Sequence, residues 1–344
     1  MTQNNYFSLK FIRKDSSREN DKLAFLDQTK LPIEENYIQT NSYERIAEAI
    51  EKLEIRGAPL IGIAAAYALA LAVKSHTNNV QDKFDLALKR LIETRPTAVN
   101  LFFALNTMKE HFLNLENLNN AYESLLNKAK EIHRKDEEYC SKIGKNGLVI
   151  FKKKSTVLTH CNTGKLATGG DGTAFNIIKT AFENDLVNFV YANETRPLLQ
   201  GLRLTAFELE KCGIPFALQT DSSAAFLMKQ NKIDLVVTGA DRIALNGDSA
   251  NKIGTYNLAL LSYHHNIPFY IAAPSTTFDR TIASGNEIEI EFRNNSELVS
   301  VYNTPIASKN YDVFNPAFDI TPSHLITGII TEEGLFNFPY NFLK

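Results

Sequence analysis

The chain has few cysteines and no excess of either charge, and both absences exclude classes of protein. Three cysteines occur among the 344 residues, at positions 140, 161 and 212, far apart and without a CxxC pair. An odd number of separated cysteines offers no disulfide framework, which favours a cytoplasmic protein. The 37 basic and 39 acidic side chains nearly balance, so nothing in the composition predicts binding to nucleic acid or to an anionic membrane surface.

The sequence also lacks an apolar run long enough for a comfortable membrane span. The segment GAPLIGIAAAYALALAV, residues 57–73, has 17 residues, which is short for a bilayer. It is rich in alanine, and Pro59 stands where the first turn of a helix tolerates proline. We therefore predict a buried helix in a helical domain. The amino-terminal residues contain no apolar core, so we expect no signal peptide.

The length and the change of pattern along the chain predict two domains. Residues 1–148 contain mainly helical patterns, with a small sheet near 7–11 and 23–27. The expected helices are 43–53, 59–75, 80–94, 98–114 and 119–143. We expect residues 149–344 to form a second, Rossmann-like domain.

In that second half, strand and helix patterns alternate. The expected strands are 156–159, 187–192, 216–220, 235–239 and 268–272, and the expected helices are 173–183, 200–212, 223–230 and 252–265. Regular alternation with short loops predicts an α/β fold with a doubly wound, mostly parallel sheet.

The most informative segment is THCNTGKLATGGDGTAF, residues 159–175. It follows a β-branched strand pattern, contains four glycines, and leads into an amphipathic helix. A strand, a glycine-rich turn and a helix start together offer backbone N–H groups to an anion. Cys161 lies at the mouth of this strand. A phosphate pocket beside a thiol suggests an enzyme that acts on a small phosphorylated molecule.

Polar residues follow all five predicted strands. Ligands bind at the carboxyl ends of strands in such sheets, so these residues point to one site. They include Cys161, Glu194, Asp221, Asp241 with Asn251 and Lys252, and Ser275.

Eight segments in order make the chain resemble a known family. They are IRGAPLIGIAAAYALAL, RPTAVNL, THCNTGKLAT with a following GT, ETRPLLQGLRLTAFEL, TDSSAA, GADRIALNGDSANKIGTY, IPFYIAAPSTTFD and NPAFDITP. They cover roughly residues 50–335. The chain resembles the methylthioribose-1-phosphate isomerases, aldose–ketose isomerases of methionine salvage that are related to the regulatory subunits of translation initiation factor 2B.

The resemblance implies roles for particular residues. The family's catalytic pair falls on Cys161 and Asp241. Its substrate-binding positions fall on Arg56, Gly57, Ala58, Arg95, Gln200, Asn251 and Lys252. The resemblance also implies a homodimer built through the second domain and a sugar phosphate as substrate.

The implied chemistry suits these residue types. A furanose esterified at its anomeric carbon cannot open spontaneously, so an acid must protonate the ring oxygen. Asp241 is the expected acid, and burial would raise its pKa. Cys161 would remove the C2 proton as a thiolate or stabilise a hydride shift, and the sequence does not choose between these. Arg56, Arg95, Lys252 and the turn at 172–173 are the expected phosphate and hydroxyl ligands.

We expect no metal and no cofactor. The sequence contains no His/Cys/Asp cluster with ligand spacing, and the glycine loop lacks the dinucleotide fingerprint. Taken without the family pattern, Cys161 could instead be a small core residue and Asp241 a turn cap. Cys140 and Cys212 are interpreted as structural, and His160 as a hydrogen-bonded structural residue.

Three departures from the family pattern leave the substrate open. Asn193 replaces the usual aspartate, Asp171 replaces the usual aromatic or neutral residue before the GT pair of the glycine loop, and Ser222–Ser223 lack the usual methionine. Three hypotheses follow: an isomerase of 5-methylthioribose 1-phosphate, a sister isomerase of 5-deoxyribose 1-phosphate or ribose 1,5-bisphosphate, and a non-catalytic binding subunit.

Overall fold

The protein forms two compact units. The computed structural model describes residues 6–13, 18–74, 79–95, 98–302, 304–340 and 342. The first unit comprises Met1–Ser141 together with Gly164–Gly172, and the second comprises Lys142–Thr163 and Thr173–Lys344. The chain therefore returns to the first unit for nine residues, which begin three residues after Cys161.

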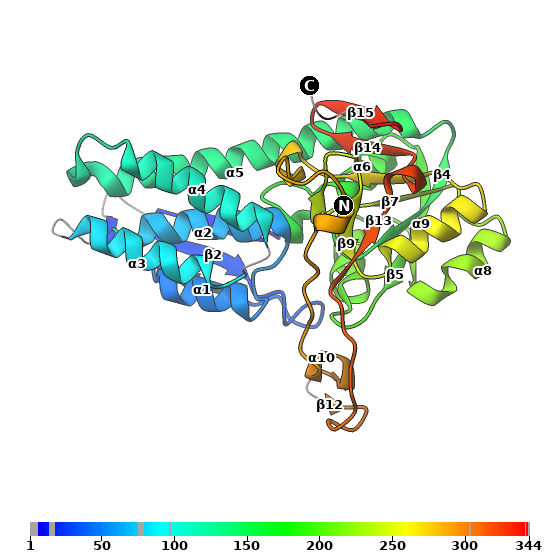
Figure 1. Ribbon diagram of the computed structural model, residues 1–344, viewed down its shortest axis with the longest axis horizontal. Helices are drawn as coiled ribbons and strands as arrows, with labels where there is room; N and C mark the ends of the chain where they lie inside the picture. The colour runs from blue at the N-terminus through cyan, green and yellow to red at the C-terminus, as the bar shows by residue number, and fades with distance from the viewer. Residues whose placement is uncertain are drawn as a thin grey trace. The chain divides into compact units, whose positions relative to one another are not determined.

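The first unit combines a small antiparallel sheet with five helices (Figure 1). Its strands are β1 (Leu9–Ile12), β2 (Lys22–Leu26) and β3 (Tyr37–Thr40), paired in that order. Its helices are α1 (Tyr43–Glu51), α2 (Ala58–Ala72), α3 (Val80–Ile92), α4 (Val99–Leu113) and α5 (Ala121–Asn146), of which α5 continues into the second unit. β3 has no counterpart among the predicted strands, and the predicted helix end at Ser75 lies outside the described residues.

Helix α2 is the centre of the first unit. It packs against α1, α3 and α4, and every residue from Leu60 to Ala72 is buried, as the apolar segment predicts. Alanine and glycine allow neighbouring helices to approach closely: a Cβ on Gly62 would lie 2.6 Å from the carbonyl oxygen of Asn100 at the start of α4. None of the helices in the described ranges is both long and apolar enough to cross a membrane.

The second unit contains a seven-stranded sheet in the order β15–β14–β10–β7–β4–β5–β6. The strands are β4 (Ser155–His160), β5 (Val187–Glu194), β6 (Phe216–Thr220), β7 (Leu235–Thr238), β10 (Phe269–Ala272), β14 (Gly328–Thr331) and β15 (Gly334–Asn337). All neighbours are parallel except β14 and β15. The predicted α/β fold class with a mostly parallel sheet is confirmed.

Helices cover both faces of this sheet. They are α6 (Ala174–Glu183), α7 (Ala206–Lys211) with a π-helical turn at Gly201–Thr205, α8 (Ala224–Lys229) and α9 (Thr255–His264). Val157 packs in one apolar cluster with residues of α6 and α7, whereas its neighbour Leu158 packs in another with residues of α8 and α9. This alternation follows from the two-residue period of a strand and is what a doubly wound sheet requires.

Two further parts of the second unit have no counterpart in the predicted elements. The short strands β8 (Arg242–Ile243), β9 (Ser249–Lys252) and β13 (Phe318–Thr321) form a second, antiparallel sheet. The predicted helix from residue 252 therefore begins three residues later, because Lys252 belongs to β9. An arm, residues 289–302 and 304–316, carries α10 (Ser296–Val299), β11 (Ser300–Val301) and β12 (Thr304–Pro305) and extends away from the large sheet (Figure 1).

The core of the first unit supplies a test of packing. The rings of Phe84 on α3 and Phe112 on α4 are stacked, with centroids 4.0 Å apart, and both side chains are buried. We expect Phe84→Ala to lower the free energy of unfolding by about 3–5 kcal/mol, because it removes a buried ring and leaves a cavity. Urea titration followed by far-ultraviolet circular dichroism measures this loss.

Leu86, on the same helix but largely exposed, is the matched control. Leu86→Ala should change the free energy of unfolding by no more than about 0.5 kcal/mol. Equal losses in the two variants would contradict the placement of Phe84 in the core.

Candidate active site

Cys161 is held in an unusual backbone conformation at the carboxyl end of β4. Its φ angle is +62°, in the left-handed region that few residues other than glycine occupy. The hydroxyl of Thr205 donates to its carbonyl oxygen at 2.5 Å. The next side chain, Asn162, is buried and donates to Glu208 at 2.5 Å. These contacts fix the backbone around a cysteine that is itself only partly buried, unlike a core thiol.

Asp241 follows β7, the strand that lies next to β4 in the sheet. Its backbone N–H donates to the carbonyl of Ala250 at 2.9 Å, which ties it to β9. Because the carboxyl ends of neighbouring parallel strands meet at one edge, Cys161 and Asp241 belong to the same edge of the large sheet. In the antiparallel β8–β9 pair, Arg242 lies opposite Ala250. Asn251 is the residue after Ala250 in β9.

The two β9 residues expected to bind substrate are buried. Asn251 donates to the hydroxyl of Thr255 at 2.9 Å. The ammonium of Lys252 donates to the carbonyl of Ala317 at 2.9 Å and lies 4.6 Å from the centroid of the Phe318 ring. The buried ammonium of Lys252 places a positive charge at this edge of the sheets.

Gln200 follows β5 and immediately precedes the π-helical turn. Its side chain is 5% exposed, and its Oε1 atom has no hydrogen-bond partner among the described residues. A buried amide oxygen without a donor is costly, and a substrate hydroxyl would satisfy it. The glycine that follows is required here, because a Cβ on Gly201 would lie 1.7 Å from the carbonyl oxygen of Asn193.

His160 and Asp319 support the same edge of the sheet. His160 is fully buried, and its Nε2 lies 2.9 Å from the carbonyl oxygen of Ile253. A carbonyl only accepts, so Nε2 carries the proton, and burial lowers the pKa of this imidazole. Asp319 accepts from the N–H groups of Gly254 and Tyr256, at 2.7 and 3.0 Å.

Sequence reasoning missed the role of Asp319, although it stands in the quoted segment NPAFDITP. Burial raises the pKa of its carboxyl to about 6, while the two N–H donors and Lys252 favour the charged form. The carboxylate stabilises the turn that follows Lys252 and the amino-terminal end of α9.

The first unit holds the other group of expected substrate ligands. Arg56 and Gly57 immediately precede α2, Ala58 is its first residue, and Arg95 stands shortly before α4. The approach of Gly62 to Asn100 brings the amino-terminal ends of these two 15-residue helices side by side. Helix amino termini and arginine side chains are groups that favour anions in general.

The glycine loop, residues 164–172, packs against this end of α2. Gly57 has a φ angle of +102°, and a Cβ there would lie 2.4 Å from the Cα of Ala167 in the loop. The side chain of Gln28 donates to the carbonyl of Leu166 at 2.7 Å, and Ser8 donates to that of Thr168 at 3.2 Å. The loop therefore belongs structurally to the first unit, although Cys161, three residues earlier, belongs to the second.

Two departures from the family pattern have a structural explanation. Asp171 forms an ion pair with Lys165 at 2.9 Å, so its charge is balanced within the loop. Asn193 is buried, and its Oδ1 accepts from Gln219 at 2.7 Å across the β5–β6 pair. The neutral amide of Asn193 accepts this hydrogen bond without burying a charge, as an aspartate at this position would.

The expected site residues thus fall into two groups, one in each unit. The second unit brings together Cys161, Asp241, Gln200, Asn251 and Lys252 at one edge of its sheets. The first brings together Arg56, Gly57, Ala58 and Arg95 at the amino-terminal ends of α2 and α4, beside the glycine loop.

Comparison with known proteins adds an independent finding. Residues 54–338 match the profile of the Initiation factor 2 subunit family. A methylthioribose-1-phosphate isomerase of Carboxydothermus hydrogenoformans is 48% identical over 94% of this chain and 95% of its own length.

Solved structures agree with this similarity. The 5-methylthioribose 1-phosphate isomerase of Pyrococcus horikoshii superposes with a TM-score of 0.90 at 36% identity, over 98% of this chain and 94% of that one. A structure named translation initiation factor eIF-2B, subunit delta, from A. fulgidus superposes with a TM-score of 0.83 at 39% identity, over 97% of both chains. From its sequence and its fold, the chain belongs to the methylthioribose-1-phosphate isomerases within the Initiation factor 2 subunit family.

Proposed function

We propose that the chain converts 5-methylthioribose 1-phosphate, an aldose, into the ketose 5-methylthioribulose 1-phosphate in methionine salvage. The observation that carries this proposal is the near-full-length identity of 48% to a methylthioribose-1-phosphate isomerase. The neighbouring strand ends that carry Cys161 and Asp241 support it, because the reaction needs two groups that exchange protons with adjacent substrate atoms.

The proposed mechanism begins with ring opening. Asp241 donates a proton to the ring oxygen while the bond from C1 to that oxygen breaks. Hydrogen then moves from C2 to C1, and the C2 hydroxyl loses its proton to the Asp241 carboxylate, which restores the acid. The substrate gains and loses no atoms, and no external oxidant or reductant is needed.

Cys161 assists the hydrogen transfer in one of two ways. As a thiolate it removes the C2 proton and returns it to C1 through an enolate; alternatively, it stabilises a direct hydride shift. Its left-handed backbone supports a special role, because strained φ values persist where surrounding contacts enforce them and are concentrated at functional sites.

The remaining residues bind the substrate in this proposal. Arg56, Arg95 and Lys252 contribute positive charge for the phosphate, and the N–H groups at Gly57 and Ala58 add donors at a helix amino terminus. Gln200 and Asn251 bind hydroxyl groups. For Gln200 this matches an Oε1 atom that otherwise lacks a donor in the described part of the chain.

The two rival functions make different demands on the protein. A sister isomerase would act on 5-deoxyribose 1-phosphate or ribose 1,5-bisphosphate by the same chemistry. The likeness to the A. fulgidus structure named as an initiation-factor subunit favours testing a non-catalytic binding role as well. Such a subunit would have no chemical need for the pair Cys161 and Asp241.

Proton NMR of the purified protein in heavy water separates these functions. We expect 5-methylthioribose 1-phosphate to be converted to the 1-phosphorylated ketose, and 5-deoxyribose 1-phosphate and ribose 1,5-bisphosphate to be converted much more slowly. Deuterium at C1 of the product would favour proton transfer by the thiolate, and its absence a hydride shift.

Other patterns of turnover would overturn the proposed substrate. Conversion of one of the other two sugars alone would assign the sister activity. No conversion of any of the three would leave the binding role.

Removing either catalytic group should abolish turnover without unfolding the protein. We expect Cys161→Ser and Asp241→Asn each to lower kcat by about 100- to 10,000-fold, because each removes a proton-transfer group. Circular dichroism should show unchanged secondary structure, and steady-state kinetics measures kcat.

Cys212→Ser is the matched control, since Cys212 is the C-cap residue that follows α7 and has no proposed part in the chemistry. It should leave kcat unchanged. Full activity in both Cys161→Ser and Asp241→Asn would refute the catalytic assignment.

We also propose a cytoplasmic homodimer assembled through the second unit. The arm supports this assembly, because it exposes five large apolar side chains: Phe292, Tyr302, Ile306, Tyr311 and Phe314. The guanidinium of Arg196 donates to three backbone carbonyls of the arm in and beside α10, at 2.8–3.3 Å, which holds this part of the arm in place. Exposed apolar groups gathered on one projection are typical of an interface.

Light scattering coupled to size exclusion tests the dimer. We expect a mass of twice the 38.6 kDa of one chain, and a monomer after Phe314→Glu, which places a charge on the arm. Leu113→Glu, at an exposed residue of α4, should stay dimeric. Dissociation by Tyr263→Glu on α9 but not by Phe314→Glu would place the interface elsewhere on the second unit, and a monomeric unmodified protein would refute the dimer.

A further inference from the structure

Two side chains of α5 hold both polar groups of one residue in the glycine loop. The carboxylate of Asp136 accepts from the N–H of Gly169 at 2.6 Å, and Nε2 of His133 lies 3.2 Å from the carbonyl oxygen of the same residue. Positions three apart lie on one face of a helix, so a single face of α5 clamps this peptide. All three residues belong to the first unit.

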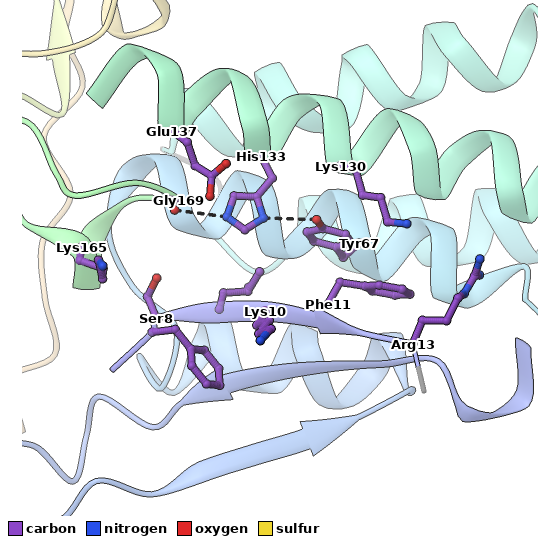
Figure 2. Close-up of a pocket in the computed structure, with 12 residues that line it drawn as sticks. Ser8, Lys10, Phe11, Arg13, Tyr67, Lys130, His133, Glu137, Lys165 and Gly169 are labelled. Atoms are coloured by element: carbon purple, nitrogen blue, oxygen red, sulfur yellow. Dashed lines mark hydrogen bonds between the residues drawn. The ribbon is translucent and has the colours of Figure 1, made fainter. Parts of the chain in front are cut away.

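The direction of the hydrogen bonds through His133 follows from its partners. The carbonyl of Gly169 can only accept, so Nε2 carries the proton and Nδ1 accepts from the hydroxyl of Tyr67 at 3.2 Å. Figure 2 shows the imidazole between these two partners. Burial lowers the pKa of His133, which keeps the imidazole neutral and able to accept.

Gly169 and Gly170 of the loop lie so close to this face of α5 that neither position has room for a side chain. A Cβ on Gly169 would lie 2.5 Å from Cδ2 of His133, and one on Gly170 would lie 2.8 Å from Cβ of Cys140. The thiol of Cys140 is 3.8 Å from the Asp136 carboxylate. Any side chain at either glycine would push the loop away from its two anchors.

We propose that His133 and Asp136 are positioning residues of the isomerase, which hold the glycine loop in the conformation that turnover requires. The inference rests on the proposed function. The loop begins three residues after Cys161 and ends at the start of α6, so a shift of the loop reaches the catalytic cysteine through a short length of chain. A misplacement of about 1 Å can cost about 100-fold in rate.

The charge of Asp136 is the part of the clamp that titrates. The pKa of its carboxyl is raised to about 6, mainly by burial and to a smaller extent by Glu137, against the opposing effect of the N–H groups of Gly169 and Gly170 and the thiol of Cys140. The other titratable groups near the clamp include His133, its partner Tyr67, and Lys130 and Lys165, which line the same cavity as His133. Above pH 6 the carboxylate accepts from the loop, and below pH 6 it is protonated and holds the loop less tightly.

The direction of this pKa shift makes it possible to tell a role of Asp136 in positioning the loop from a role in stabilising the fold. A carboxyl with a raised pKa in the folded state stabilises the protein most when protonated, and that stability is lost as the pH rises through about 6. Asp136→Asn removes the charge and keeps a similar shape. We therefore expect its Tm at pH 8 to equal or exceed that of the unmodified protein.

The experiment compares Asp136→Asn with Glu138→Gln, which removes an exposed carboxylate of the same helix that pairs with Arg134. Hydrogen–deuterium exchange of residues 164–172 should become about tenfold faster in Asp136→Asn, as for the loss of one charge-assisted hydrogen bond. Its kcat should fall by about 10- to 100-fold with little change in KM. The unmodified protein should lose kcat below about pH 6, and Asp136→Asn should lack this acid limb. Glu138→Gln should match the unmodified protein throughout.

His133 provides a second, independent variant. A cavity of about 590 Å³ in the first unit is lined by His133 and Gly169, together with Tyr67 and Lys165 (Figure 2). This cavity gives small solutes access to the clamp. We expect His133→Ala to lose kcat and to recover part of it on addition of imidazole, which replaces the donor to Gly169. Glu138→Gln should not respond to imidazole.

The failure of this inference can be told from that of the proposed function. If the unmodified protein does not isomerise the sugar phosphate, the proposed function fails, while the exchange rates still report the clamp. If the unmodified protein turns over and Asp136→Asn keeps its kcat and its acid limb, the positioning role is refuted. A fall in Tm at pH 8 that parallels the loss of kcat would also refute it, because Asp136 would then only stabilise the fold.

Discussion

The structure of the first unit depends on hydrogen bonds that other parts of the unit make to the backbone of the glycine loop. Apart from one short 3-10 turn at Lys165–Ala167, this loop has N–H and carbonyl groups that need partners wherever water is excluded. Gln28 and Ser8 donate to two of its carbonyls, and Asp136 accepts from one of its N–H groups. These contacts come from the residue before β1, from the turn after β2 and from α5, so three separate parts of the first unit converge on nine residues. The close approach of Gly57 to Ala167 adds the start of α2.

Local pattern predicted the elements that have strong periodicity. The strand expected at 216–220 is β6, and the one expected at 156–159 is β4 with one more residue at each end, because β-branched and apolar runs between helical patterns leave little choice. The buried helix at 57–73 is α2, since alanine-rich segments of that length pack well inside a domain. Short strands had no such signal. β9 and β13 have four residues each and pair over a separation of almost 70 residues, as in Asn251 with Asp319, so only the folded chain reveals them.

The candidate site likewise has residues that the sequence could predict and contacts that only the structure shows. Motifs identified Cys161, Asp241 and the residues of β9 because each stands after a recognisable strand or in a family segment. They could not reveal the left-handed φ of Cys161, which depends on Thr205, or the ion pair of Lys165 with Asp171, which removes an apparent conflict with phosphate binding. His133 and Asp136 stand more than 30 residues before Gly169, the loop residue that they contact. On α5 they belong to a polar helix pattern, and nothing in that pattern distinguishes them from solvent-exposed neighbours.

The division of the chain has a consequence for any attempt to dissect it. The path passes from one unit to the other at residues 141–142, returns at 163–164 and leaves again at 172–173. No single cut yields two complete units. A fragment ending at residue 141 would lack the nine-residue loop of its own unit. Gln28 and Ser8 would lose the carbonyl groups to which they donate, and the Asp136 carboxylate would lose its amide donors. We therefore expect the two units to fold properly only when they are expressed as one chain, even though each has its own hydrophobic core.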